Sequence, residues 1–195
     1  PYTHGFGVDP DDPSRFDLDE PLRLLRRFEE LGVELVNVTL GSPYHNPHLQ
    51  RPAAYPPSDG YQPPADPLVF VKQHLDVVRA AKQCCPALKF VGTGYTYLQE
   101  WLMHCAQREV RDGHVDFVGL GRMLLSYPEL GRDVLAGKEV QRRRICRTFS
   151  DCTTGPRNGM ISGCFPLDPH YKAMPEAAKI LSLIHISEPT RHHVI

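Results

Sequence analysis

Two glycine-rich turns are the segments of this sequence best suited to binding chemistry. One occupies residues 92–95 and the other residues 119–122, and each follows a short apolar run. Because glycine has no Cβ, such a turn lets backbone N–H groups approach an anion closely, and a helix beginning there adds partial positive charge. A guanidinium can grip two phosphate oxygens at once. The pattern predicts a phosphate site at Gly94, Tyr95, Gly121 and Arg122.

Two other interpretations of these turns need weighing. Glycine turns between a strand and a helix are common where nothing binds, so either turn alone leaves the question open. A dinucleotide-binding fingerprint is disfavoured, because no third glycine follows Gly94 at the required spacing and no acidic residue ends the next strand. The presence of two consecutive turns, the second with Arg122, favours a phosphate site.

The turns sit in a regular alternation of strands and helices. Apolar runs at residues 34–40, 88–92 and 115–119 predict strands, and helical spacing predicts helices before, between and after them. This order implies right-handed crossovers and a parallel α/β sheet. Apolar and polar residues alternate little within each run, which is typical of strands covered on both faces. A doubly wound sheet and a (β/α)₈ barrel both fit this order.

Two local patterns carry further expectations. In the helix predicted over residues 66–83, Leu68, Val71, Leu75 and Val78 share one face. The segment 41–67 is longer than the ~12–15 residues usual for a structureless loop, so we expect an ordered lid or binding loop. Its residues Tyr44 and His45 either line a substrate mouth or lie on the loop surface.

Composition excludes several classes of partner. The 195 residues are 41% hydrophobic and 23% charged, which is typical of a globular chain. A formal net charge of −1 argues against nucleic acid and acidic membrane surfaces. No apolar run approaches the ~20 residues that cross a bilayer, and no secretory signal is present. The six cysteines are then expected to be reduced thiols of a cytoplasmic protein.

Because the chain begins with Pro1, we expect a preceding segment.

Four stretches together carry a family resemblance. They are residues 41–48 (GSPYHNPH), 56–61 (PPSDGY), 117–122 (FVGLGR) and 146–152 (CRTFSDC). Over residues 1–179 the chain resembles the old yellow enzyme superfamily of NADH:flavin oxidoreductases, nearer its bacterial 2,4-dienoyl-CoA reductase-like branch. The resemblance implies a partial (β/α)₈ TIM barrel. Residues 1–140 would be about the last three βα units of an FMN-binding barrel, and residues 141–179 a Cys-containing C-terminal extension.

The resemblance also implies an activity for the parent protein. FMN would lie across the barrel mouth, with its phosphate on the backbone near Gly94 and Tyr95 and near Gly121 and Arg122. NAD(P)H would reduce the flavin, which would pass hydride to an activated C=C bond of a small molecule. In this family a His/Asn pair on earlier strands binds the substrate carbonyl. No catalytic residue is therefore assigned here, and the chain itself is expected to be inactive.

Two alternatives to this activity stay open. One is another phosphate-binding barrel enzyme, such as an aldolase or a dehydrogenase of a phosphorylated substrate. The other is a binding module or a piece without activity of its own. A flavin absorption band in the parent protein would separate the first alternative from an FMN enzyme.

The cysteines of the extension resemble an incomplete cluster motif. Dienoyl-CoA reductases hold a [4Fe–4S] cluster through four cysteines after the barrel, and Cys146, Cys152 and Cys164 match this pattern in part. The second cysteine of the run is missing, with Thr148 or Phe149 near its place. Clusters of this type take four thiolates, so we expect no iron–sulfur cluster and no metal.

The end of the chain resembles a cloning artefact. Residues 181–191 (LSLIHISEPTR) look like the translation of a sequencing adapter, so we expect residues 180–195 to be a non-native tail. This interpretation sets aside a strand at residues 181–186 and a metal site at His185, His192 and His193.

Overall fold

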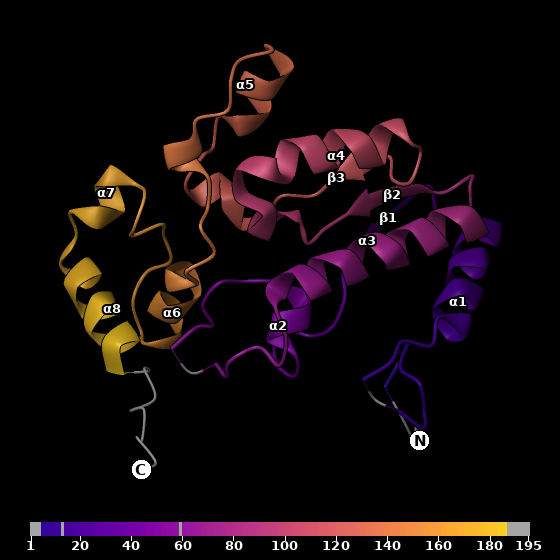
Figure 1. The fold of residues 1–195 in the computed structure, drawn as a ribbon, viewed down its shortest axis with the longest axis horizontal. Helices are drawn as coiled ribbons and strands as arrows, with labels where there is room; N and C mark the ends of the chain where they lie inside the picture. The colour runs from indigo at the N-terminus through magenta and orange to yellow at the C-terminus, as the bar shows by residue number, and fades with distance from the viewer. Residues whose placement is uncertain (1–4, 13, 59, 187–195) are drawn as a thin grey trace.

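Three strands form one parallel sheet, and their order in the sheet is their order in the chain (Figure 1). The computed structural model describes residues 5–12, 14–58 and 60–186. Strand β1 is Leu35–Val38, β2 is Lys89–Gly92 and β3 is Phe117–Val118. The prediction of an α/β chain with a parallel sheet is confirmed.

Helices cover one face of this sheet. The main ones are α1 (Asp19–Glu30), α3 (Pro67–Cys84) and α4 (Leu102–Arg111), the last preceded by the 3-10 helix η1 (Tyr95–Trp101). Side chains alternate between the faces of a strand, so Val36, Val38 and Phe90 point the same way. They pack with Val78 and Ala81 of α3 in the core beneath the helices.

The opposite face of the sheet is uncovered. Leu35 and Phe117, which point away from the helices, are 55% and 54% exposed. The expectation that both faces of every strand are covered is therefore wrong for this chain. The physical reason is that α1, α3 and α4 all return on the same side, so no described element is left to cover the other.

Helix α3 begins as predicted and buries Val71 and Val78 of the predicted stripe, but not Leu68. Its N-cap is Asp66, whose carboxylate accepts a hydrogen bond from the Leu68 N–H at 2.8 Å. Leu68 is 52% exposed, so the predicted stripe is wrong at its first position, because this turn buries Phe70 against His48 of the long segment instead. The residues that α3 buries are Phe70, Val71, His74, Val78 and Ala81.

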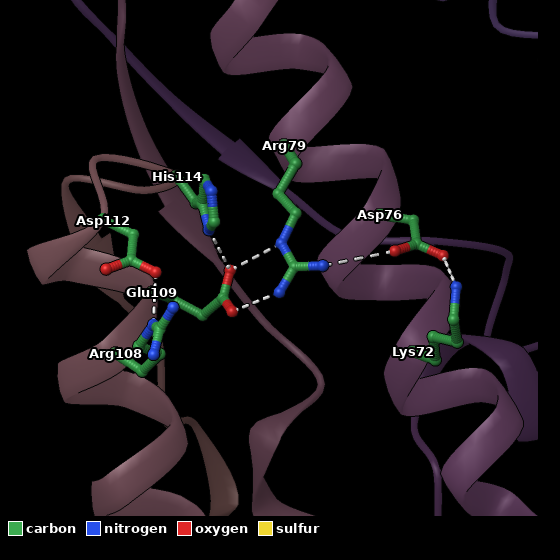
Figure 2. Close-up of polar contacts among 7 residues, drawn as sticks. All are labelled: Lys72, Asp76, Arg79, Arg108, Glu109, Asp112 and His114. Carbon is green, nitrogen blue, oxygen red and sulfur yellow. Dashed lines mark hydrogen bonds and ion pairs between the residues drawn. The ribbon is translucent and has the colours of Figure 1, made fainter.

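An ion pair fixes α3 against α4 (Figure 2). Glu109 of α4 has a side chain only 3% exposed, and both its oxygens accept hydrogen bonds from Arg79 of α3, one at 2.9 Å from Nε. His114 Nδ1 lies 3.2 Å from the same carboxylate. The two helices are therefore joined by a buried charge as well as by apolar packing.

The chain after β3 forms short helices. They are η2 (Arg122–Leu125), α5 (Leu130–Leu135), η3 (Arg142–Arg144), α6 (Asp151–Arg157), α7 (Pro169–Lys172) and α8 (Pro175–Ile186). The first two, η2 and α5, pack around a second core, and the last three pack on one another. The second core contains Tyr95, Leu102, Met123 and Tyr127. Residues 181–186 are helical, so the strand that the sequence analysis set aside is absent there. The remainder of the expected non-native tail, with His192 and His193, lies outside the described residues.

The long segment between β1 and α3 packs against the C-terminal extension. It contains the short helix α2 (Pro47–Gln50), and its Ala54 N–H donates to Thr148 Oγ1 at 2.9 Å. The Ser58 N–H donates to Thr154 Oγ1 at 3.1 Å. In the described part of the chain, no helix combines the length and apolar character that crossing a membrane requires.

Candidate functional site

A cavity of about 320 Å³ lies where the three strands end. The strands are parallel, so their carboxyl ends meet at one edge of the sheet, which is where ligands of open α/β sheets bind. Alternate residues of each strand and its following turn line the cavity, which places it on the uncovered face. These residues are Asn37, Thr39, Val91, Thr93, Gly119 and Gly121.

Gly94 lines this cavity and needs to be glycine. Its φ is 90°, in the left-handed region, and a Cβ there would fall 2.7 Å from Cγ of His74. His74 is buried, and its Nε2 lies 2.8 Å from the Leu49 carbonyl oxygen. Burial lowers the pKa of His74, which therefore favours the neutral imidazole. The backbone at Gly94 thus passes closely over a buried histidine to reach the cavity.

Tyr95 does not line this cavity. Its side chain is fully buried in the second core, and its hydroxyl has no hydrogen-bond partner in the part of the chain that the structure describes. Burial raises the pKa of the Tyr95 hydroxyl further above its ordinary value. The phenol therefore has no role in the cavity, and the use of the Tyr95 backbone amide stays a prediction.

The second turn brings Gly121 and Arg122 to the same cavity. No atom lies within 4 Å of the position that a Gly121 Cβ would take, so the backbone there faces open space. Arg122 Nη1 donates to Thr153 Oγ1 at 2.6 Å. Burial, and then the charge of Arg51, lower the pKa of Arg122 to about 10. Three of the four predicted residues, Gly94, Gly121 and Arg122, therefore line one cavity, and Tyr95 is not among its lining residues.

The elements after the two turns are shorter than expected. Gly94 precedes the seven-residue η1, and Gly121 precedes the four-residue η2. Both are 3-10 helices, whose hydrogen-bond geometry is poorer than that of an α-helix. The expected contribution of a long helix dipole is therefore small, and the site depends on close backbone approach and on arginine.

Arg51 is a site residue that the sequence analysis missed. It follows α2 in the long segment and lines the cavity with Arg122. Its Nη1 donates to Ser150 Oγ at 3.2 Å, and its Nη2 lies 3.6 Å from Cys146 Sγ. The only sequence signal was the length of the segment, which predicted a binding loop without indicating which residue would bind.

Tyr44 and His45 lie away from this cavity. Tyr44 is 88% exposed, as expected of a loop-surface residue. His45 lines a separate apolar cavity between α1 and β1, and its carbonyl oxygen accepts a hydrogen bond from the Tyr61 hydroxyl at 3.4 Å. Neither side chain is among those at the strand ends.

The three cysteines of the extension lie near the two arginines. Cys146, Cys152 and Cys164 line a small cavity together with Arg51 and Arg122. All six cysteines of the chain are free thiols, and burial raises the pKa of Cys164 to about 11. Among the described residues, no group of three or more His, Cys, Asp or Glu side chains is placed to hold a metal ion.

Asp151 is a second residue that the sequence analysis missed. It is 7% exposed, its Oδ1 has no hydrogen-bond partner among the described residues, and burial raises its pKa to about 6. It follows Ser150, a non-glycine residue in the left-handed region with φ 66°. A buried carboxyl oxygen without a partner, beside a strained residue, marks this turn as locally unfavourable.

Comparison with protein-family models, with curated proteins and with solved structures finds no match for this chain. The function of the cavity is therefore argued from its own geometry and chemistry.

Proposed function

We propose that this chain supplies the FMN-phosphate end of a flavin-dependent oxidoreductase built on a (β/α)₈ barrel. In a doubly wound sheet the helices alternate between the two faces. Here α1, α3 and α4 lie on one face, and sheet order follows chain order. Both features support a segment of a barrel, whose helices all lie outside and whose missing strands would enclose Leu35 and Phe117.

The observation that carries the proposal is the cavity at the strand ends. Barrel enzymes bind phosphate with the loops after their last two strands, which matches the positions of both glycine turns. Gly94 brings backbone close to the cavity, Gly121 leaves open space above its Cα, and Arg122 supplies positive charge. A phosphate dianion fits this donor set.

In such a site the cofactor carries out the reaction, and the protein binds and orients the cofactor. FMN, when bound, supplies hydride transfer from NAD(P)H to an activated C=C bond of a small-molecule substrate. The residues of this chain bind and orient: amides near Gly94 and Tyr95 and the Arg122 guanidinium hold the phosphate. Catalytic residues would come from other strands of the parent enzyme, which we propose to be cytoplasmic.

Amide chemical-shift mapping tests this proposal, because it also detects weak binding. We expect FMN added to the ¹⁵N-labelled chain to shift the amides of Gly94, Tyr95, Gly121 and Arg122, and riboflavin to shift them far less. Gly121→Ala should fold normally, since its methyl meets no atom within 4 Å, but should weaken these shifts by filling the cavity.

Two results would count against the proposal. Equal shifts with FMN and riboflavin would show that the phosphate is not recognised. Equal shifts with inorganic phosphate and FMN would leave an anion site without a preference for flavin and would favour an enzyme of phosphorylated substrates.

A further inference from the structure

Arg51 and Arg122 form a pair of like charges at one cavity. Both line the space at the strand ends, although they come from segments far apart in the chain. Neither forms an ion pair with a carboxylate among the described residues. Two partly buried cations side by side are unfavourable unless an anion lies between them. The cavity that they share is the place where such an anion fits.

The C-terminal extension holds both guanidinium groups at this cavity. Ser150 Oγ and Cys146 Sγ accept hydrogen bonds from Arg51, and Thr153 Oγ1 accepts one from Arg122. These acceptors are neutral hydroxyls and a weakly accepting sulfur, so they orient the arginines without neutralising them. Each guanidinium has five N–H donors, and those not used in these contacts remain to bind a ligand.

We infer that Arg51 and Arg122 together bind a single phosphate dianion, and that residues 146–153 are positioning residues for both arginines. This inference deepens the proposed function, on which it rests, because it names a terminal phosphomonoester as the group recognised. It also gives the extension a role that needs no cluster: it forms the second wall of the phosphate site. A dianion between two guanidinium groups accepts charge-assisted hydrogen bonds from both sides, which favours a monoester over a singly charged diester.

Affinity for FMN and riboflavin in the full chain tests the role of Arg51. We expect Arg51→Met to weaken FMN binding about tenfold or more and to leave riboflavin unchanged, since one charge-assisted contact is lost. Arg143→Met is the matched control, because it removes the same charge from an exposed position outside the cavity. If Arg51→Met behaves like the control, the inference is wrong.

Two further variants keep the test decisive. Arg51→Lys preserves the charge and should retain part of the FMN affinity even if Arg51→Met does not fold. Thr153→Val should weaken FMN binding by releasing Arg122, and Thr153→Ser should restore it, because serine keeps the accepting hydroxyl. Equal losses with valine and serine, or a parallel loss of riboflavin binding, would contradict a positioning role.

Inorganic phosphate distinguishes failure of this inference from failure of the proposed function. If FMN shows no preference over riboflavin but phosphate binds and Arg51→Met weakens it about tenfold, the arginine pair stands and the flavin assignment falls. If wild-type protein binds neither phosphate nor FMN, or binds phosphate equally well in Arg51→Met, the arginine pair is not a phosphate site.

Discussion

Asp151 lies beside the proposed binding site, and the burial of its carboxyl destabilises the folded state. Its carboxyl lies at the start of α6, between the strained Ser150 and the thiol Cys152, and burial rather than any charged partner shifts its pKa. Arg51 and Arg122 lie around the same small cavity, but neither contributes to that shift. Ionised Asp151 is therefore a buried charge without an ion-pair partner among the described residues, and it lies close to the two arginines.

The raised pKa of Asp151 predicts that the folded state loses stability as the pH rises. The folded pKa is about 6 and the ordinary value is 3.8, so the folded state holds this proton more tightly. The associated stability is fully present below pH 3.8 and is lost as pH rises through about 6. We expect Asp151→Asn to be more stable than wild type at pH 7.5 by about 2 kcal/mol, with the difference shrinking toward pH 4.

Urea unfolding at pH 4.5 and pH 7.5 measures this effect. Wild-type protein should lose more stability between the two conditions than Asp151→Asn does. The same pH dependence in both proteins would show that Asp151 does not titrate near pH 6.

At the scale of elements, one buried ion pair holds the helical layer together. Figure 2 shows Arg79 of α3 reaching across to Glu109 of α4, with Asp76 and His114 at either side. Hydrogen bonds from Arg79 satisfy a carboxylate that is almost fully removed from water. The position of α4 relative to α3, and hence of the turn at Gly94 that precedes η1, depends on this contact.

Removing Arg79 should therefore cost far more than removing an exposed arginine. We expect Arg79→Met to lower the free energy of unfolding by about 3 kcal/mol, because Glu109 is left buried with only His114 as a partner. Arg108→Met is the control: Arg108 pairs with Asp112 but its side chain is 71% exposed, so a change below about 0.5 kcal/mol is expected. Chemical unfolding followed by circular dichroism compares the two variants, and similar losses would contradict the account.

At the scale of the whole molecule, the uncovered face of the sheet leaves apolar side chains exposed to solvent. Parallel sheets are normally covered on both faces, yet Leu35 and Phe117 are half exposed here. Among the described residues β1 and β3 each pair only with β2, so the described sheet has two free edges. Unpaired edges beside an apolar face favour association between chains.

Charging the uncovered face should reduce this association. We expect Leu35→Lys to lower the fraction of self-associated chain several-fold at the same concentration, without loss of helix content. Leu135→Lys is the matched control, because Leu135 is 90% exposed on α5, away from the sheet. Light scattering after size-exclusion chromatography measures both; an equal effect of the two substitutions would show that the sheet face is not the associating surface.

The order of the elements and the two glycine turns were predictable from the sequence because they depend on local chemistry. Apolar runs, helical spacing and a glycine that must take a positive φ are each determined within a few residues. Burial along α3 was predicted less well, since its first turn buries Phe70 against the distant His48 and leaves Leu68 exposed.

The sequence by itself therefore determined a parallel α/β arrangement and the identity of the turns at its strand ends. Only the tertiary structure decided which face of the sheet is covered, that Arg51 lies beside Arg122, and that Asp151 is buried. These features depend on contacts between segments distant along the chain. No local pattern encodes such contacts, because they arise only when the long segment and the extension pack against each other.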